Sequence, residues 1–175
     1  MSELYVCLSS PVGSEESRRA TLAVNGVANP QKALPMELHV FLPCPALPTR
    51  EAWQAGISDH GFLLTLDEAL DVRSHTGFSR AVCWGRKSGF EFGLSPALDV
   101  ASRYPGVPER IGVRDLSANF RWHGNVLESV IVYVASAVFA KMTDGILYYP
   151  QKNHFATGYE TMAMARQLIE VMELE

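Results

Sequence analysis

The densest group of polar side chains lies at residues 71–78, which read Asp-Val-Arg-Ser-His-Thr-Gly-Phe. Arg73 can pair with an anion, and His75 carries an imidazole, a group that can accept or donate a proton. One hypothesis is therefore a small-ligand site or an enzyme active site around Arg73 and His75. The alternative is a hydrogen-bonded loop whose polar side chains only position the next strand.

A second polar and aromatic group, Arg121-Trp122-His123-Gly124, stands directly before a long helix-like segment. Arg and Trp are the commonest anchors of protein interfaces, although a Trp in a strand also often packs in the core. A third group is the pair Trp84 and Arg86, which flank Gly85 in an expected hairpin connection. Together these groups supply the candidate binding residues, which are Arg73, His75, Trp84, Arg86, Arg121, Trp122 and His123.

The sequence lacks the motifs of the common catalytic, phosphate-binding and zinc sites. The patterns GxxxxGK[ST], GxGxxG, GxSxG and HExxH do not occur, and the five histidines are isolated from one another. Cys83 lies near Arg80 and Arg86, which favours a thiolate, but inside an apolar strand it is more typical of a small core side chain. We therefore predict no catalytic residue, no metal and no cofactor.

Charge and cysteine content limit the partners and the compartment. The net charge is −4, with 15 basic and 19 acidic residues, whereas nucleic-acid binding needs a basic surface. Three cysteines outside any CxxC pattern are typical of a reducing compartment, and the first residues do not form a signal peptide. The most apolar run, residues 130–140, is far shorter than the roughly 20 residues of a membrane-spanning helix. We expect a cytoplasmic protein that binds neither nucleic acid nor membrane.

The elements that must position these residues alternate between strands and helices. Residues 1–35 form an extension, predicted to be a hairpin on the sheet edge, and residues 36–175 form one domain. Capping residues Asn125 and Thr157, each followed three residues later by Glu, predict the starts of two helices. We predict an α+β fold with a mainly antiparallel sheet of about six strands and about three helices packed on one face.

Several segments resemble a known group of proteins when taken in order. These segments are ELHVFLP, TREAWQAGISDHGFLLTLD, SGFEFGLSPA and FRWHGNVLESVIVYVASAVFAKMTDGILYYPQ. They resemble a loosely characterised group of small bacterial cytosolic α+β proteins, over about residues 36–170. Similar proteins are often encoded beside toxins of contact-dependent or type VI secretion systems and act as immunity proteins. The resemblance implies binding to a toxin or effector and brings no catalytic residues.

Three functions follow as hypotheses. The first is a non-catalytic protein-binding protein, most concretely an immunity protein that neutralises a cognate bacterial toxin through a few aromatic and Arg anchors. The second is a small-ligand-binding protein or enzyme with its site around Arg73 and His75. The third is a secretion-system adaptor subunit or homo-oligomer whose apolar surface is covered by self-association. The missing motifs favour binding over catalysis.

Overall fold

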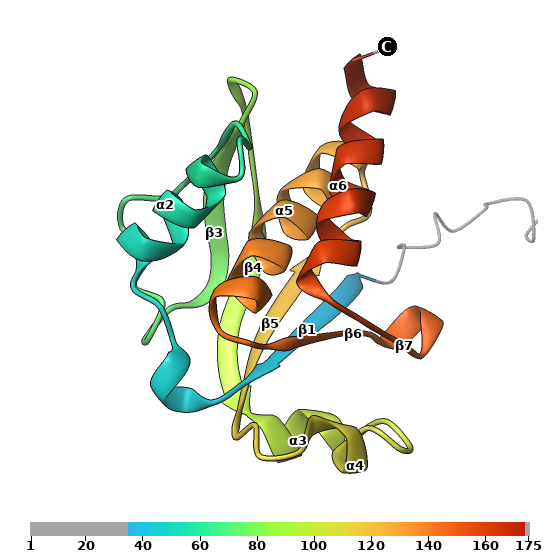
Figure 1. The fold of residues 1–175 in the computed structure, drawn as a ribbon. Coiled ribbons are helices and arrows are strands. Elements are labelled where there is room, and N and C mark those ends of the chain that lie inside the picture. The colour runs from blue at the N-terminus through green and yellow to red at the C-terminus, as the bar shows by residue number, and fades with distance from the viewer. Residues whose placement is uncertain (1–34, 174–175) are drawn as a thin grey trace, which may run out of the picture. The chain divides into compact units, whose positions relative to one another are not determined.

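The computed structural model describes residues 35–173, which surround a seven-stranded antiparallel sheet with the strand order β2-β3-β4-β5-β1-β6-β7 (Figure 1). The strands are β1 (Met36–Leu42), β2 (Leu64–Leu66), β3 (Thr76–Cys83), β4 (Arg86–Pro96), β5 (Leu116–Trp122), β6 (Ile146–Tyr149) and β7 (His154–Ala156). The helices are α2 (Arg50–Asp59), α3 (Ala97–Ala101), α4 (Pro108–Ile111), α5 (Val126–Met142) and α6 (Gly158–Glu173), with short 3-10 turns η1 (Cys44–Ala46) and η2 (Pro150–Lys152). The predicted α+β class is confirmed. The predicted hairpin in residues 1–35 lies outside the described part of the chain.

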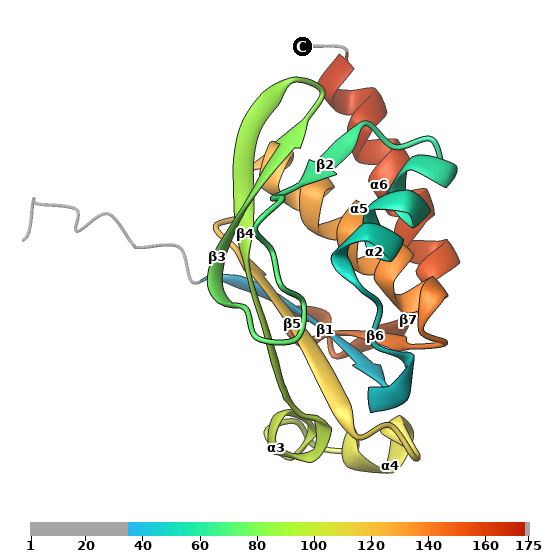
Figure 2. The ribbon, with the colours of Figure 1, turned by 90° about the vertical axis from the view of Figure 1, so that its left-hand side faces the viewer.

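Three main helices, α2, α5 and α6, form a layer on one face of the sheet, as predicted (Figures 1 and 2). Helix α5 is buried at every residue from 130 to 140, because it lies between the sheet and the other two helices. Trp53 of α2 inserts beside it, donating from Nε1 to the Ala135 carbonyl at 2.9 Å and packing edge-on against Phe139. Within residues 35–173, no helix is long and apolar enough to cross a membrane.

The predicted helix starts are confirmed with one difference in the hydrogen bonding. Thr157 and Glu160 form the reciprocal capping box, with N–H to side-chain distances of 2.7 and 3.2 Å. Asn125 Oδ1 accepts from the Glu128 N–H at 2.8 Å, as expected of a helix cap. The Glu128 carboxylate accepts from the His123 N–H instead of the cap residue's own N–H. The hydrogen bond to the Glu128 carboxylate therefore fixes the backbone at His123, two residues before the helix cap.

The hairpin between β3 and β4 is longer and its turn tighter than predicted. Strand β3 begins at Thr76, inside the segment that the sequence indicated as a polar loop. The turn is Trp84-Gly85, with φ angles of 50° and 73°. A two-residue turn with both φ values positive matches the twist of paired strands, although a Trp rarely adopts such an angle. The sequence predicted a strand only from Arg80, and the first half of β3 was missed because its exposed polar residues hide the alternation of its buried ones.

The other face of the sheet is only partly covered by helices. Near one end, Phe41 and Tyr148 pack beneath α3 and α4 and contact side chains such as Val100 and Ile111. Figure 2 shows no helix of the described chain over β3 and β4 on this side. We call this uncovered side, formed by outward side chains of β3, β4, β5 and β1, the open face. It carries the candidate site.

Candidate functional site

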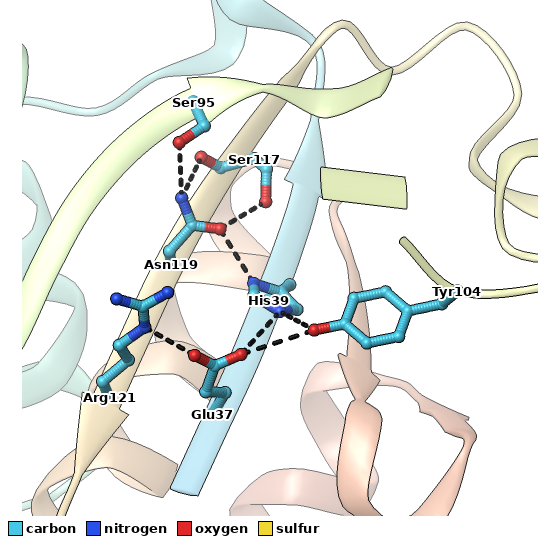
Figure 3. A network of polar contacts seen from close by, with 7 residues as sticks. All are labelled: Glu37, His39, Ser95, Tyr104, Ser117, Asn119 and Arg121. Atoms are coloured by element: carbon cyan, nitrogen blue, oxygen red, sulfur yellow. Dashed lines mark hydrogen bonds and ion pairs between the residues drawn. The ribbon is translucent and has the colours of Figure 1, made fainter. Parts of the chain in front are cut away.

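The strand register places polar side chains in two adjacent rows on the open face. One row is Glu91, Arg121 and Glu37, from β4, β5 and β1, and the next is Gly93, Asn119 and His39 from the same strands. Side chains directly opposite one another on neighbouring strands lie close enough to interact. Four of these residues, Glu37, His39, Asn119 and Arg121, belong to one connected group of polar contacts (Figure 3).

His39 is the buried centre of this group, with a side chain only 1% exposed. Its Nδ1 lies 2.8 Å from Asn119 Oδ1, which also accepts from Ser117 Oγ at 2.8 Å, while Asn119 Nδ2 donates to Ser95 Oγ at 3.0 Å. Burial lowers the pKa of His39, outweighing the hydrogen bond to Asn119, which raises it. Because an amide oxygen only accepts, the neutral ring carries its proton on Nδ1 and leaves Nε2 without one.

The unprotonated Nε2 faces a carboxylate and a phenol. Glu37 Oε2 lies 3.7 Å from His39 Nε2, and the Tyr104 hydroxyl lies 3.4 Å from the same nitrogen and 3.4 Å from Glu37 Oε2. Arg121 Nε forms an ion pair with Glu37 Oε1 at 2.6 Å. Burial, with help from Glu37, raises the pKa of Tyr104, so the tyrosine stays a hydrogen-bond donor. The Glu37 charge is thus compensated within the network.

A cavity of about 240 Å³ lies directly over this network, and we call it the sheet cavity. Its lining includes the side chains of His39, Asn119, Arg121, Arg103 and Glu91, together with Gly93. A Cβ built on Gly93 would lie 3.8 Å from its nearest contact across the chain, the His75 carbonyl oxygen. Packing therefore does not require glycine at this position, and the missing side chain leaves the hollow open.

Beside the cavity, the open face carries an exposed aromatic residue. Phe78 of β3 is 60% exposed, and its ring lies over Gly89 of β4, where a built Cβ would meet Phe78 Cε2 at 2.9 Å. Arg80 and Val82 follow at alternate positions and are also exposed. Lys87 is directly opposite Val82. We call Phe78, Arg80, Val82 and Lys87 the Phe78 surface.

Arg73 and His75 occupy different surroundings. Arg73 is exposed and borders a separate cavity between the start of α2 and the loop before β3, and His75 is not among the described residues that line it. His75 Nε2 lies 3.2 Å from the Gly77 carbonyl oxygen, and its ring lies beside Phe92. Its neighbours Thr76 and Gly77 line the sheet cavity. The segment thus supplies a wall of that cavity, while Arg73 lies apart from it.

The other candidate residues are spread over the molecule. Arg121 lines the sheet cavity, whereas Trp122 is 2% exposed and donates from Nε1 to Ser129 Oγ at 3.0 Å, so its ring offers no surface to a partner. His123 is exposed beside the start of α5. Trp84 and Arg86 lie at the β3–β4 turn, where Trp84 is half-buried against the core. Of the seven candidates, only Arg121 belongs to the buried network.

His39, Glu37 and Asn119 were not among the predicted site residues, because the network joins residues up to 80 positions apart in the sequence. One signal was present. Both β1 and β5 alternate buried apolar residues with polar ones, and the polar positions of the two strands pair with each other in the register. Two polar residues on β1 and three on β5, all on the face away from the helices, indicate a built polar site.

Cys83 is buried, as expected of a core side chain, and burial raises the pKa of its thiol to about 12. Cys44 is exposed. Within residues 35–173, no three His, Cys, Asp or Glu side chains are grouped so that they would hold a metal ion. The described cysteines therefore include one accessible thiol and one that stays protonated.

Fold and site together define an α+β protein with a polar cavity and an exposed aromatic residue on the open face of an antiparallel sheet. Compared with protein-family models, with curated proteins and with solved structures, the chain shows no match. The proposals for its function rest on the residues of the open face.

Proposed function

We propose that this protein is a non-catalytic binding protein whose open face holds a protein partner, as an immunity protein holds and neutralises a cognate bacterial toxin. The observation that carries the proposal is Phe78, a large aromatic side chain left 60% exposed in the middle of an ordered strand. Exposed aromatic residues set in a polar surround are typical of interface anchors. The resemblance to immunity proteins favours the same class.

Phe78 has the geometry of a pre-organised anchor. Its ring rests on Gly89 and is held on a paired strand, so little side-chain freedom is lost when a partner covers it. An aromatic side chain buries about 150–250 Å², so covering the exposed part of Phe78 removes roughly 120 Å² from water and contributes about 3 kcal/mol. A contribution of that size is typical of a hot spot.

The charge of the open face indicates an acidic partner surface. Arg80, Lys87 and Arg121 project from it, whereas the chain as a whole has a net charge of −4. Glu91 lies on the same face, and Glu37 is paired with Arg121. A locally basic face in an acidic protein orients an acidic partner and speeds its association. Cys44 and Cys83 are free thiols, which are typical of the reducing cytoplasm, where this protein would bind its partner.

The test is affinity capture from the native cell lysate with three forms of the chain. These are the wild type, Phe78→Ser and the control Val113→Ser, since Val113 is 92% exposed and lies in the loop before β5. We expect one near-stoichiometric partner with the wild type and with Val113→Ser, and its loss with Phe78→Ser. The captured protein should be toxic when expressed alone, and co-expression of the wild type should relieve that toxicity.

Two results would overturn the proposal. The first is capture of the same partner at equal yield by Phe78→Ser, with the thermal unfolding of the variant unchanged. The second is a partner whose toxicity is relieved equally by wild type and Phe78→Ser. Because Phe78 is mostly exposed, the Ser variant should keep its fold, which thermal unfolding of the three forms checks.

A further inference from the structure

We propose that the sheet cavity is a binding site for a small carboxylic acid, held by Arg103 and Arg121. This inference goes beyond the protein-binding function proposed above and does not depend on it. The cavity measures about 240 Å³, below the roughly 300–1,000 Å³ of pockets for drug-sized ligands. Its occupant is therefore the size of a di- or tricarboxylic acid and not of a nucleotide.

Two guanidinium groups and two carboxylates surround the cavity. Arg103 and Arg121 both lie close enough to His39 to lower its pKa. Glu37 is engaged by Arg121 Nε and by the Tyr104 hydroxyl, while Glu91 lines the cavity. The described charges therefore balance, so a bound anion is held by local contact with the guanidinium groups and not by a net positive charge.

Arg103 supplies the free guanidinium. Within residues 35–173 its side chain has no ion-pair or hydrogen-bond partner, although it lines the cavity. A carboxylate matches the forked donors of a guanidinium with two parallel hydrogen bonds. Arg121 has its Nε on Glu37, which fixes the side chain and leaves its terminal nitrogens for a ligand. Glu91 is exposed, lies directly opposite Arg121 on the neighbouring strand and also lines the cavity.

The remaining lining residues are suited to a ligand with further oxygen atoms. Thr76 and Ser95 bring hydroxyl groups to the wall, and Gly93 leaves room above the sheet. The hydrogen bonds of Asn119 to His39 and to Ser95 link β5 to β1 and β4 at the base of the cavity. The ion pair with Glu37 holds Arg121, so its guanidinium loses little freedom when a ligand binds, whereas the exposed Arg103 must become ordered.

The experiment measures thermal unfolding of the full chain with succinate, malate or citrate, each at about 10 mM, a concentration above ordinary metabolite affinities. Chloride at equal ionic strength, succinamide and inorganic phosphate are the comparison solutions. The variants are Arg103→Gln, which removes the free guanidinium, and Gly93→Val, which fills the hollow. The matched control is Arg80→Gln, because Arg80 lies on the same face but does not line the cavity.

We expect at least one acid, but not succinamide, to raise the unfolding temperature of the wild type and of Arg80→Gln. Arg103→Gln should weaken the binding of that acid by about tenfold or more, because a charge-assisted hydrogen-bonded pair is lost. Gly93→Val should abolish binding. Adding the acid should shift the ring nitrogen resonances of His39 in the wild type and in Arg80→Gln but not in Gly93→Val. Such a shift locates the ligand beside His39.

The inference is overturned if no acid raises the unfolding temperature above that in chloride. It is equally overturned if Arg103→Gln binds as tightly as Arg80→Gln, or if phosphate binds and the carboxylic acids do not. Should Gly93→Val fail to fold, the comparison of the two arginine variants decides. If the carboxylic acid proposal fails, the proposed binding of a protein partner through Phe78 is unaffected, because Phe78 does not line the cavity.

Discussion

The hydrogen bond between His39 and Asn119 gives a quantitative test of how the site is built. The perturbation is a double-mutant cycle of His39→Ala, Asn119→Ala and the double variant. In His39→Ala, the Asn119 side chain keeps Ser117 and Ser95 as partners, so the loss is the hydrogen bond to Asn119, the long contact of Nε2 with the Tyr104 hydroxyl and the space left by the ring. We expect this variant to lower the free energy of unfolding by about 2 kcal/mol.

Asn119→Ala should lower the free energy of unfolding by more than His39→Ala does. It leaves the Nδ1–H of His39, a side chain that is 1% exposed, without its acceptor, and it also removes the partner of Ser95 and Ser117. An unsatisfied buried donor costs about 1–3 kcal/mol, so we expect a total loss of about 3 kcal/mol. The coupling energy between His39 and Asn119 should be about 1 kcal/mol or more. Urea denaturation at about pH 8, where His39 is neutral, measures all four forms.

The same variants carry a pH dependence with a defined sign. Burial lowers the pKa of His39 below its ordinary value of 6.5, so as the pH falls through 6.5 the unfolded chain takes up a proton that the folded chain does not. This contribution to stability is present above pH 6.5 and is lost below it, down to the folded pKa. Burial is the largest influence on the pKa of His39; Asn119 and Glu37 raise it, Arg121 and Arg103 lower it, and the Tyr104 hydroxyl also lies beside the ring.

The free-energy difference between wild type and His39→Ala should therefore shrink as the pH is lowered through 6.5. Comparing the two forms cancels the titration of the other histidines. A coupling energy near zero, or a difference that grows toward acid pH, would refute the reasoning. Either result would mean that His39 is solvated or charged in the folded protein.

Two further predictions concern the core and the open face. In a Cys7→Ser background, Cys44 should react with a maleimide within minutes, and Cys83 should react only on unfolding, since Cys44 is exposed while Cys83 is buried with a raised pKa; mass spectrometry after timed quenching checks this. Fast labelling of Cys83 in the folded protein would show that its strand opens. Gly89→Ala should destabilise the protein by about 1–3 kcal/mol, because the new Cβ collides with the Ser79 carbonyl and the Phe78 ring; urea denaturation checks this, and an unchanged midpoint would count against that packing.

Most of the fold was predictable because local signals agreed with the burial pattern. The capping residues Asn125 and Thr157 marked the starts of two helices, and the apolar run at residues 130–140 forms the buried middle of α5. In β1, Glu37 and His39 alternate with Leu38 and Val40, which is the pattern of a strand with one apolar face. The first half of β3 was missed because Thr76, Phe78 and Arg80 point outward, so polar and apolar residues mix on its exposed side.

The site was less predictable because strand register, and not sequence proximity, brings it together. His39 and Asn119 meet only because β1 pairs with β5 residue for residue, and no local pattern specifies that pairing. The segment around Arg73 was predicted as a site because its polar residues are adjacent in the sequence. Adjacent residues of an extended chain point to opposite sides, so such a cluster need not converge on one cavity.

The most direct test of the central claim, that the open face is a partner-binding surface, is hydroxyl-radical footprinting of Phe78 in the free protein and in its complex with the captured partner. Tyr159, 67% exposed on α6, is the internal control. The account predicts rapid oxidation of Phe78 in the free full-length chain, strong protection in the complex and unchanged oxidation of Tyr159. Phe78 protected already in the free chain would mean that another segment or a second copy covers the open face. Equal oxidation of Phe78 in both states would place the partner elsewhere, and either result would contradict the claim.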